Sequence, residues 1–182
     1  AAISDVLVEN FTPGLMERFG LGYETLRELN PRLVHASITA YGQDGPYRDR
    51  TGYDMVLSAV GGLMHITGER DGNPCKVGVA ITDVLTGVYA AGAITSALLW
   101  RERSGRGQYL DVSLLDVEVA GLANIASNYL VAGQEATRWG TAHESIIPYQ
   151  VFQTRDRPIA IAVANQKLWV SFCKLVGREE WL

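Results

Sequence analysis

The first 38 residues alternate between short apolar runs and short helical patterns, and this alternation constrains the fold more than any other feature. Residues 5–10 and 33–38 are apolar runs typical of buried strands. Between them lie helical patterns over 15–19 and 23–29, the first with Thr12 as the expected cap and Pro13 at the first helical position. Strands that alternate with helices favour a parallel sheet. The sequence therefore predicts a parallel α/β architecture.

The middle of the chain continues this pattern with longer helices. After a loop over 39–52 and a short helix over 53–62, the longest helix is predicted over 83–103, ended by Ser104-Gly105. Its core, residues 84–100, is apolar but contains Gly and Thr, so we expect a buried helix of a globular domain and no membrane span. A strand follows over 108–112. Ser113 to Asp116 resembles a capping box that opens a helix running to Gly133.

The pattern changes beyond Arg138, where two strands (146–153 and 159–163) precede a helix over 166–176. We expect a large domain over 1–138 and the start of a smaller α+β domain over 139–182, with the boundary within 134–145. The chain has no initiator Met, and its last residues directly follow an amphipathic stretch. We therefore expect it to be a portion of a longer protein.

Composition and missing motifs exclude several classes of function. Among 182 residues the net charge is −4, which argues against a nucleic-acid-binding protein. The three histidines lack metal-ligand spacing, and Cys75 and Cys173 are expected to be free thiols, so no metal site is predicted. The glycine-rich phosphate loops, the nucleophile elbow and the zinc-binding helix motif are all absent.

Asp83 is the acidic residue with the greatest chemical interest, because it opens the longest predicted helix. The positive field of a helix N-terminus would favour its ionised form. An ionised carboxylate in a pocket can act as a nucleophile towards an activated acyl group. A structural N-cap is the alternative, and pattern alone favours the cap.

Asn10 and Phe11 end the first predicted strand, where open α/β sheets bind ligands. Arg18, on the following helix, is suited to holding a phosphate, although a solvated cation at a helix end is the more common case. Asn and Phe are also ordinary residues of a strand-to-helix turn.

Several motifs, taken in order, resemble the family III CoA-transferases. The most specific run is Gly78-Val79-Ala80-Ile81-Thr82-Asp83, continued by Thr86-Gly87. Earlier matches are the segments 8–14, 21–23, 30–33, 41–47 and 52–54, and a later one is 104–108. The resemblance implies a Rossmann-like parallel sheet in the large domain.

The resemblance also implies roles for individual residues. Asp83 matches the catalytic aspartate, which in this family becomes an aspartyl-CoA thioester. No cofactor is bound permanently, since coenzyme A and acyl-CoA are substrates. The positions implied to contact CoA are Asn10, Phe11, Arg18, Thr51, Gly52, Tyr53 and Asp54.

Two alternatives to a transferase remain open. The related α-methylacyl-CoA racemases carry a histidine where this chain has Tyr53, and a phenol with a pKa near 10 is a poor proton shuttle at neutral pH. A non-catalytic CoA-binding fragment is the other alternative.

Segments 63–68, 139–143 and 147–150 resemble members that act on dicarboxylic acids, with Arg138 or His143 as a candidate partner for the distal carboxylate. We expect acyl-CoA and carboxylic acid substrates, an interlocked homodimer in the full-length protein, and a cytoplasmic or mitochondrial-matrix location.

Overall fold

The computed structural model describes residues 1–182, which divide into two compact units. The first unit contains residues 1–65 and 76–136, and the second contains residues 66–75 and 137–182. The domain boundaries predicted above stay a prediction for the full-length protein.

A parallel three-stranded sheet forms the centre of the first unit. Its strands are β1 (Val6–Glu9), β2 (Val34–Thr39) and β3 (Tyr109–Ser113), in the order β1-β2-β3. Val6 pairs with Val34, and His35 pairs with Tyr109. The predicted parallel α/β architecture is confirmed. All three strands end at the same edge of the sheet, which places the residues after Glu9, Thr39 and Ser113 close together.

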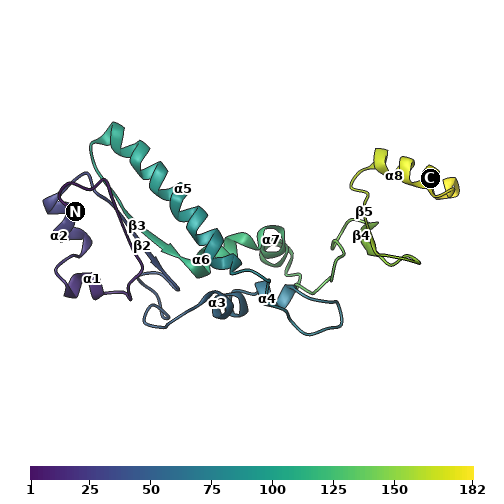
Figure 1. Ribbon diagram of the computed structural model, residues 1–182, viewed down its shortest axis with the longest axis horizontal. Helices are drawn as coiled ribbons and strands as arrows, with labels where there is room; N and C mark the ends of the chain where they lie inside the picture. Colours follow the sequence, from purple (N-terminus) through teal and green to yellow (C-terminus); the bar gives the residue numbers. More distant parts are fainter. The chain divides into compact units, whose positions relative to one another are not determined.

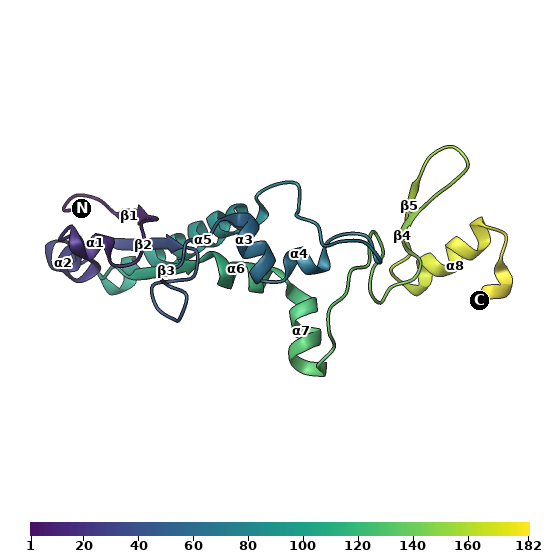
Figure 2. The same ribbon diagram turned by 90° about the horizontal axis from the view of Figure 1, so that it is seen from below.

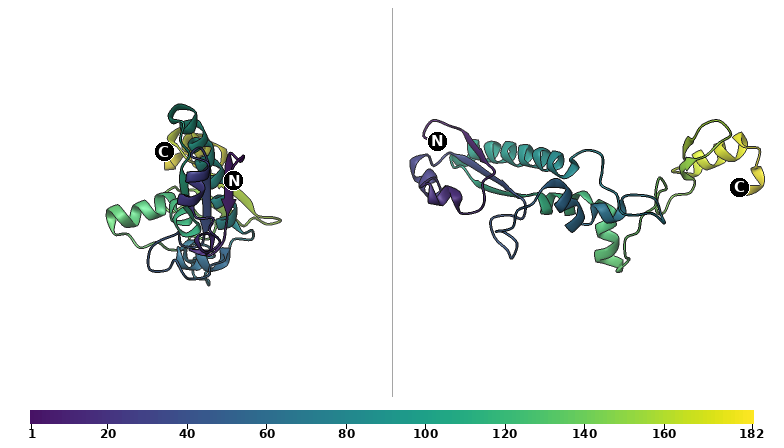
Figure 3. Two further views of the ribbon diagram at one scale, coloured as in Figure 1. Left: turned by 90° about the vertical axis from the view of Figure 1, so that its left-hand side faces the viewer. Right: turned by 60° about the horizontal axis from the view of Figure 1, so that its bottom comes forward.

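Helices cover both faces of this sheet (Figures 1 and 3). The short helices α1 (Leu15–Arg18) and α2 (Tyr23–Leu29) lie on one face, where Met16 and Leu26 pack with Leu33. The long helix α5 (Ile81–Ser104) lies on the other face, where Ala90 packs with Val112. Removing these apolar side chains from water stabilises both layers.

Two helices, α3 (Asp54–Val60) and α4 (Leu63–Ile66), precede α5, and α6 (Leu114–Gly121) and α7 (Ala123–Ala132) follow β3. Ser113 caps α6 by accepting a hydrogen bond from the Asp116 amide at 3.0 Å, as predicted. The single helix expected up to Gly133 is instead broken at Ala123, whose φ of 47° lies outside the helical region. After this break, α7 leads away from the sheet (Figure 2).

The predicted cap of α1 is wrong. Gly14 is the N-cap residue, with φ of 80°, and no side chain caps the helix. The Thr12 carbonyl accepts a hydrogen bond from the Leu15 amide instead, so a backbone turn replaces the side-chain cap. The left-handed backbone conformation at this position costs little free energy only for glycine.

Helix α5 is buried on one side only. Thr82, Thr86, Ala90, Ala97 and Arg101 face the sheet and the neighbouring helices. On the opposite side several apolar side chains are exposed, among them Val84, Val88 and Leu99. The helix that was expected to be buried is therefore buried on one face and exposed on the other in this chain. By length and composition alone, α5 could also cross a membrane, which is weak evidence because core helices pass the same test.

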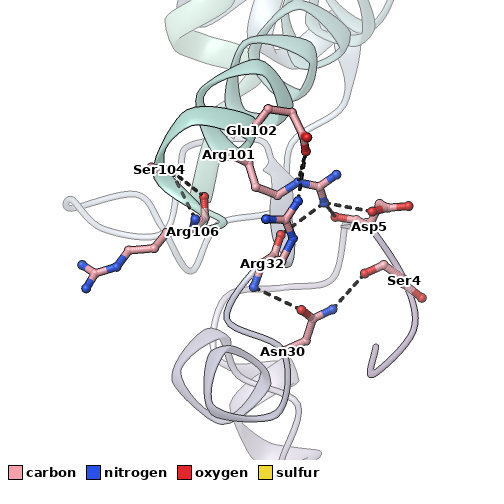
Figure 4. Close-up of polar contacts among 8 residues, drawn as sticks. All are labelled: Ser4, Asp5, Asn30, Arg32, Arg101, Glu102, Ser104 and Arg106. Atoms are coloured by element: carbon pink, nitrogen blue, oxygen red, sulfur yellow. Dashed lines mark hydrogen bonds and ion pairs between the residues drawn. The ribbon is translucent and has the colours of Figure 1, made fainter.

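A polar cluster around Arg101 joins the C-terminal end of α5 to the start of the sheet (Figure 4). The Arg101 Nη1 atom lies 3.0 Å from Asp5 Oδ1 and also donates to the carbonyl of Arg32. Asn30 donates to the carbonyl of Ser4, before β1. The two Arg101 contacts fix α5 to the entries of β1 and β2, and the Asn30 contact fixes the end of α2 to the entry of β1.

The second unit contains an antiparallel hairpin and a helix. The hairpin is formed by β4 (Tyr149–Phe152) and β5 (Ile159–Ala162), both shorter than predicted. It leads to α8 (Gln166–Leu175), which Asn165 caps through the Leu168 amide, and then to the 3-10 helix η1 (Glu179–Trp181). Trp169 stacks on Trp181 with ring centroids 6.3 Å apart.

Candidate active site

A cavity of about 470 Å³ lies at the edge of the sheet where the strands end. Asn10 follows β1, Thr39 ends β2, and Leu114 follows β3, and all three line this cavity. The first turns of α5 provide Asp83, Thr86 and Gly87 on another side. The cavity therefore lies where open parallel sheets bind ligands.

The turn from β1 to α1 is held by a buried acid. Glu9 is 9% exposed, and its Oε2 atom accepts a hydrogen bond from the Phe11 amide at 2.8 Å. This contact fixes the turn that carries Asn10. Phe11 itself is half-exposed and contacts Phe19 edge to face, and the exposed Arg18 donates to the Gly14 carbonyl. Neither Phe11 nor Arg18 lines the cavity around Asp83.

The segment Thr51-Gly52-Tyr53 brings three more predicted residues to the cavity. A side chain at Gly52 would place its Cβ 2.5 Å from Leu57 and 2.6 Å from Ala40, so only glycine fits without displacing neighbours. This close approach brings the segment against the end of β2. Tyr53 is 74% exposed at the cavity, whereas Asp54, the next residue, is buried.

Asp83 is not the cap of its own helix. It is the third residue of α5, whose N-cap position is held by Ala80 without a side-chain hydrogen bond. The cap comes from Asp54, whose Oδ2 atom accepts hydrogen bonds from the Thr82 amide at 2.9 Å and the Asp83 amide at 3.4 Å. Because another carboxylate satisfies these amides, the Asp83 side chain remains exposed to the cavity. The structural-cap interpretation of Asp83 is therefore wrong.

The pKa of Asp83 shifts in the direction opposite to the one expected from the helix N-terminus. Burial raises the pKa of the Asp83 carboxyl above its ordinary value, and the nearby Asp54 carboxylate raises it further. Asp54 neutralises the positive helix end that was expected to favour ionisation. A more basic carboxylate is a stronger nucleophile once ionised.

Sequence reasoning missed a buried polar group behind the cavity. Glu118, on α6, is 2% exposed and accepts a hydrogen bond from Thr82 Oγ1 at 2.7 Å. Burial raises the pKa of Glu118, the Asp54 charge adds to this, and hydrogen bonds from Thr82 and the Leu63 amide oppose it. The available signal was a charged residue between Val117 and Val119 on an apolar helix, because such residues are rarely buried unless paired.

Five of the predicted residues therefore meet in one cavity. These are Asn10, Thr51, Gly52, Tyr53 and Asp83. Asp54 lies behind the start of α5, and Phe11 and Arg18 lie on the turn and helix after β1. His143, a candidate for the distal carboxylate, lies in the second unit, where its Nδ1 atom accepts a hydrogen bond from the Ser145 amide.

Comparison with known proteins agrees with the resemblance seen in the motifs. The model of the family described as CoA-transferase family III matches residues 1–182. The human succinyl-CoA:glutarate CoA-transferase is 49% identical over 99% of this chain, which covers 41% of that protein. The succinate--glutarate CoA-transferase of Agrobacterium fabrum is 47% identical over 96% of the chain and 44% of that protein.

Further relatives extend this comparison. The succinyl-CoA:mesaconate CoA-transferase of Haloarcula hispanica is 38% identical over 97% of the chain and 46% of that protein. A crystal structure of a CAIB/BAIF family protein from Brucella suis superposes with a TM-score of 0.83 at 44% identity, covering 98% of this chain and 47% of that one. The chain thus spans less than half the length of these relatives. With the family model matched over its whole length, the chain belongs to CoA-transferase family III.

Proposed function

We propose that the full-length protein containing this chain transfers coenzyme A from an acyl-CoA, such as succinyl-CoA, to a dicarboxylic acid. The observation that carries this proposal is the exposed Asp83 carboxylate at the cavity, released from capping its own helix by Asp54. Family membership supports the reaction class. The names of the relatives, which include glutarate and mesaconate as acceptors, support the substrate class.

The proposed reaction proceeds through covalent intermediates on Asp83. A carboxylate oxygen of Asp83 attacks the thioester carbonyl carbon, the C–S bond breaks, and CoA leaves as the thiolate with a mixed anhydride on Asp83. The thiolate then attacks the Asp83 carbonyl carbon, which releases the donor acid and leaves an aspartyl-CoA thioester. The acceptor carboxylate repeats these two steps in reverse order. The thioester energy is kept in covalent bonds, so the exchange needs no nucleotide.

The other cavity residues bind and orient the substrates in this proposal. Asn10 and Thr51 offer uncharged hydrogen-bonding groups, and Tyr53 offers an aromatic face with a hydroxyl. Phe11 and Arg18 extend the CoA site beyond the cavity, with Arg18 suited to a phosphate. We also propose that the full-length protein is an interlocked homodimer, as the family resemblance implies. Apolar side chains exposed on α5 and α7, such as Leu99 and Leu130, offer surface for the partner or for the rest of the chain to cover.

Trapping of the thioester in the full-length protein tests the function. The enzyme is incubated with succinyl-CoA, treated with hydroxylamine and digested, and the peptide containing Asp83 is examined by mass spectrometry. We expect a hydroxamate at Asp83, and its loss together with turnover in Asp83→Asn. Asp44→Asn, a change at an exposed acid, is the matched control. Full turnover in Asp83→Asn would refute the proposal, and exchange of the α-proton of a 2-methylacyl-CoA in D₂O without an acceptor acid would indicate a racemase.

A further inference from the structure

Thr82, the residue before Asp83, is fixed by hydrogen bonds from three directions. Its amide donates to Asp54 Oδ2 at 2.9 Å, its hydroxyl donates to Glu118 Oε2 at 2.7 Å, and its carbonyl accepts from Thr86 Oγ1 at 2.7 Å. The Thr82 side chain is completely buried, and Ser58 Oγ lies 3.2 Å from its hydroxyl. No other residue in the first turn of α5 is held by so many side chains.

The Asp83 carboxylate, by contrast, accepts no hydrogen bond from another residue of the chain. Its position in the cavity therefore depends on the backbone that carries it, and that backbone is held through Thr82. Displacement of a reacting group by about 1 Å can cost about a hundredfold in rate. Contacts that fix Thr82 are thus in a position to affect the chemistry at Asp83 without touching the substrate.

The cost of burying Glu118 argues that its role is more than packing. Burial of a carboxyl is unfavourable, and an apolar side chain of similar volume is often neutral or stabilising in its place. Glu118 also lies near Asp54, whose negative charge adds to this cost. Its Oε1 atom is so close to Gly61 that a Cβ there would lie 2.5 Å away, so α6 and the end of α3 are closely fitted around the carboxyl.

We propose that Glu118 and Thr82 are positioning residues: the carboxyl of Glu118, acting through the Thr82 hydroxyl, fixes the first turn of α5 and so directs Asp83 into the cavity. This inference rests on the proposed function of Asp83. Glu118, 35 positions after Asp83 in the chain, would then control the rate of the covalent step. The pair acts on the position of the nucleophile and not on the affinity for acyl-CoA.

Substitution of one partner and then of both separates positioning from stability. In the full-length enzyme, Thr82→Val removes the hydroxyl at nearly constant shape, and Thr82→Ser keeps it. The double variant Thr82→Val/Glu118→Met removes both polar partners, so no buried carboxyl is left without its donor. Thr95→Val is the matched control, because the Thr95 hydroxyl donates to the Ala91 carbonyl at an exposed position of the same helix.

We expect Thr82→Val to lower kcat at least about tenfold with KM for succinyl-CoA within about twofold, and Thr82→Ser to stay within about threefold of the parent enzyme. The double variant should regain only part of the melting temperature, because the Leu63 amide and the Ser58 hydroxyl lose their partners, but it should keep the low kcat and the slow formation of the trapped Asp83 species. Recovery of kcat in the double variant, or a loss in Thr82→Val that only follows the fraction of folded protein, would overturn the inference. If Asp83→Asn retains turnover, the proposed function itself fails, which is a separate result.

Discussion

Removal of the Asp54 carboxylate is the perturbation whose effect the structure defines most closely. Asp54 is 9% exposed and accepts hydrogen bonds from the amides of Thr82 and Asp83, so its side chain caps the N-terminal end of α5 from another helix. Asp54→Ala leaves both amides without this acceptor. The Thr82 amide is buried, so water cannot readily replace the lost partner.

The expected loss in the free energy of unfolding follows from two estimates for the same contact, that of Asp54 with the Thr82 and Asp83 amides. Loss of an N-cap side chain costs about 0.5–2 kcal/mol. A buried donor left unsatisfied costs about 1–3 kcal/mol. These overlap and are not added, and relief of repulsion between Asp54 and the carboxyls of Asp83 and Glu118 offsets part of the loss. We expect Asp54→Ala to lower the free energy of unfolding by about 2 kcal/mol, which is about a thirtyfold change in the equilibrium constant.

Two measurements on the full-length protein test this magnitude. Urea denaturation gives the change in the free energy of unfolding, and native-state hydrogen exchange gives the protection of the Thr82 amide. Asp54→Asn keeps an oxygen acceptor and should lose less than Asp54→Ala, while Asp44→Ala is an exposed control. If Asp54→Ala and Asp44→Ala differ by less than about 0.5 kcal/mol, or if exchange at Thr82 is unchanged, Asp54 does not cap α5.

Three further predictions follow from the same geometry. The pKa of Asp83 is raised partly by Asp54, so in Asp54→Asn the acid limb of the kcat/KM profile should move to lower pH; an unmoved limb contradicts the coupling. Since the raised pKa makes ionised Asp83 unfavourable in the fold, Asp83→Asn should raise the melting temperature at neutral pH. This gain should vanish below the ordinary pKa of Asp, where the carboxyl is protonated in both the folded and the unfolded chain. Calorimetry at the two pH values tests this, and an equal gain at both would contradict it. Gly107→Ala should destabilise the protein by about 2 kcal/mol or more in urea denaturation, because its Cβ would lie 1.8 Å from the Leu33 carbonyl oxygen; wild-type stability would refute this packing.

Local sequence signals predicted the elements with clear punctuation. The helix over 23–29 has the predicted bounds, because Gly22 precedes it and Asn30-Pro31 ends it. The end of α5 was also predictable, since Gly105 adopts φ of 73° and its amide donates to the Arg101 carbonyl. The break at Ala123 was missed because alanine is a strong helix former and no residue there marks a turn.

The motifs likewise identified the residues of the cavity, but not what each of them does for α5. Asp83, Asn10 and the segment 51–53 were named from the sequence, and the fold brings them together at the end of the sheet. The sequence did not show that Asp54, and not Asp83, caps α5, because 28 residues separate Asp54 from the Thr82 amide that it caps. A local pattern shows which residue stands at a helix start, but not which distant side chain reaches it.

The sequence by itself thus determined the order of strands and helices and the chemical candidates, because capping, turns and apolar periodicity act over a few residues. Only the tertiary structure decided that Asp54 caps α5, that Glu118 is buried against Thr82, and that Asp83 is left exposed to the cavity. These outcomes depend on contacts between α3, α5 and α6. Their energies come from burial and charge in a shared interior, which exists only once the helices have packed together.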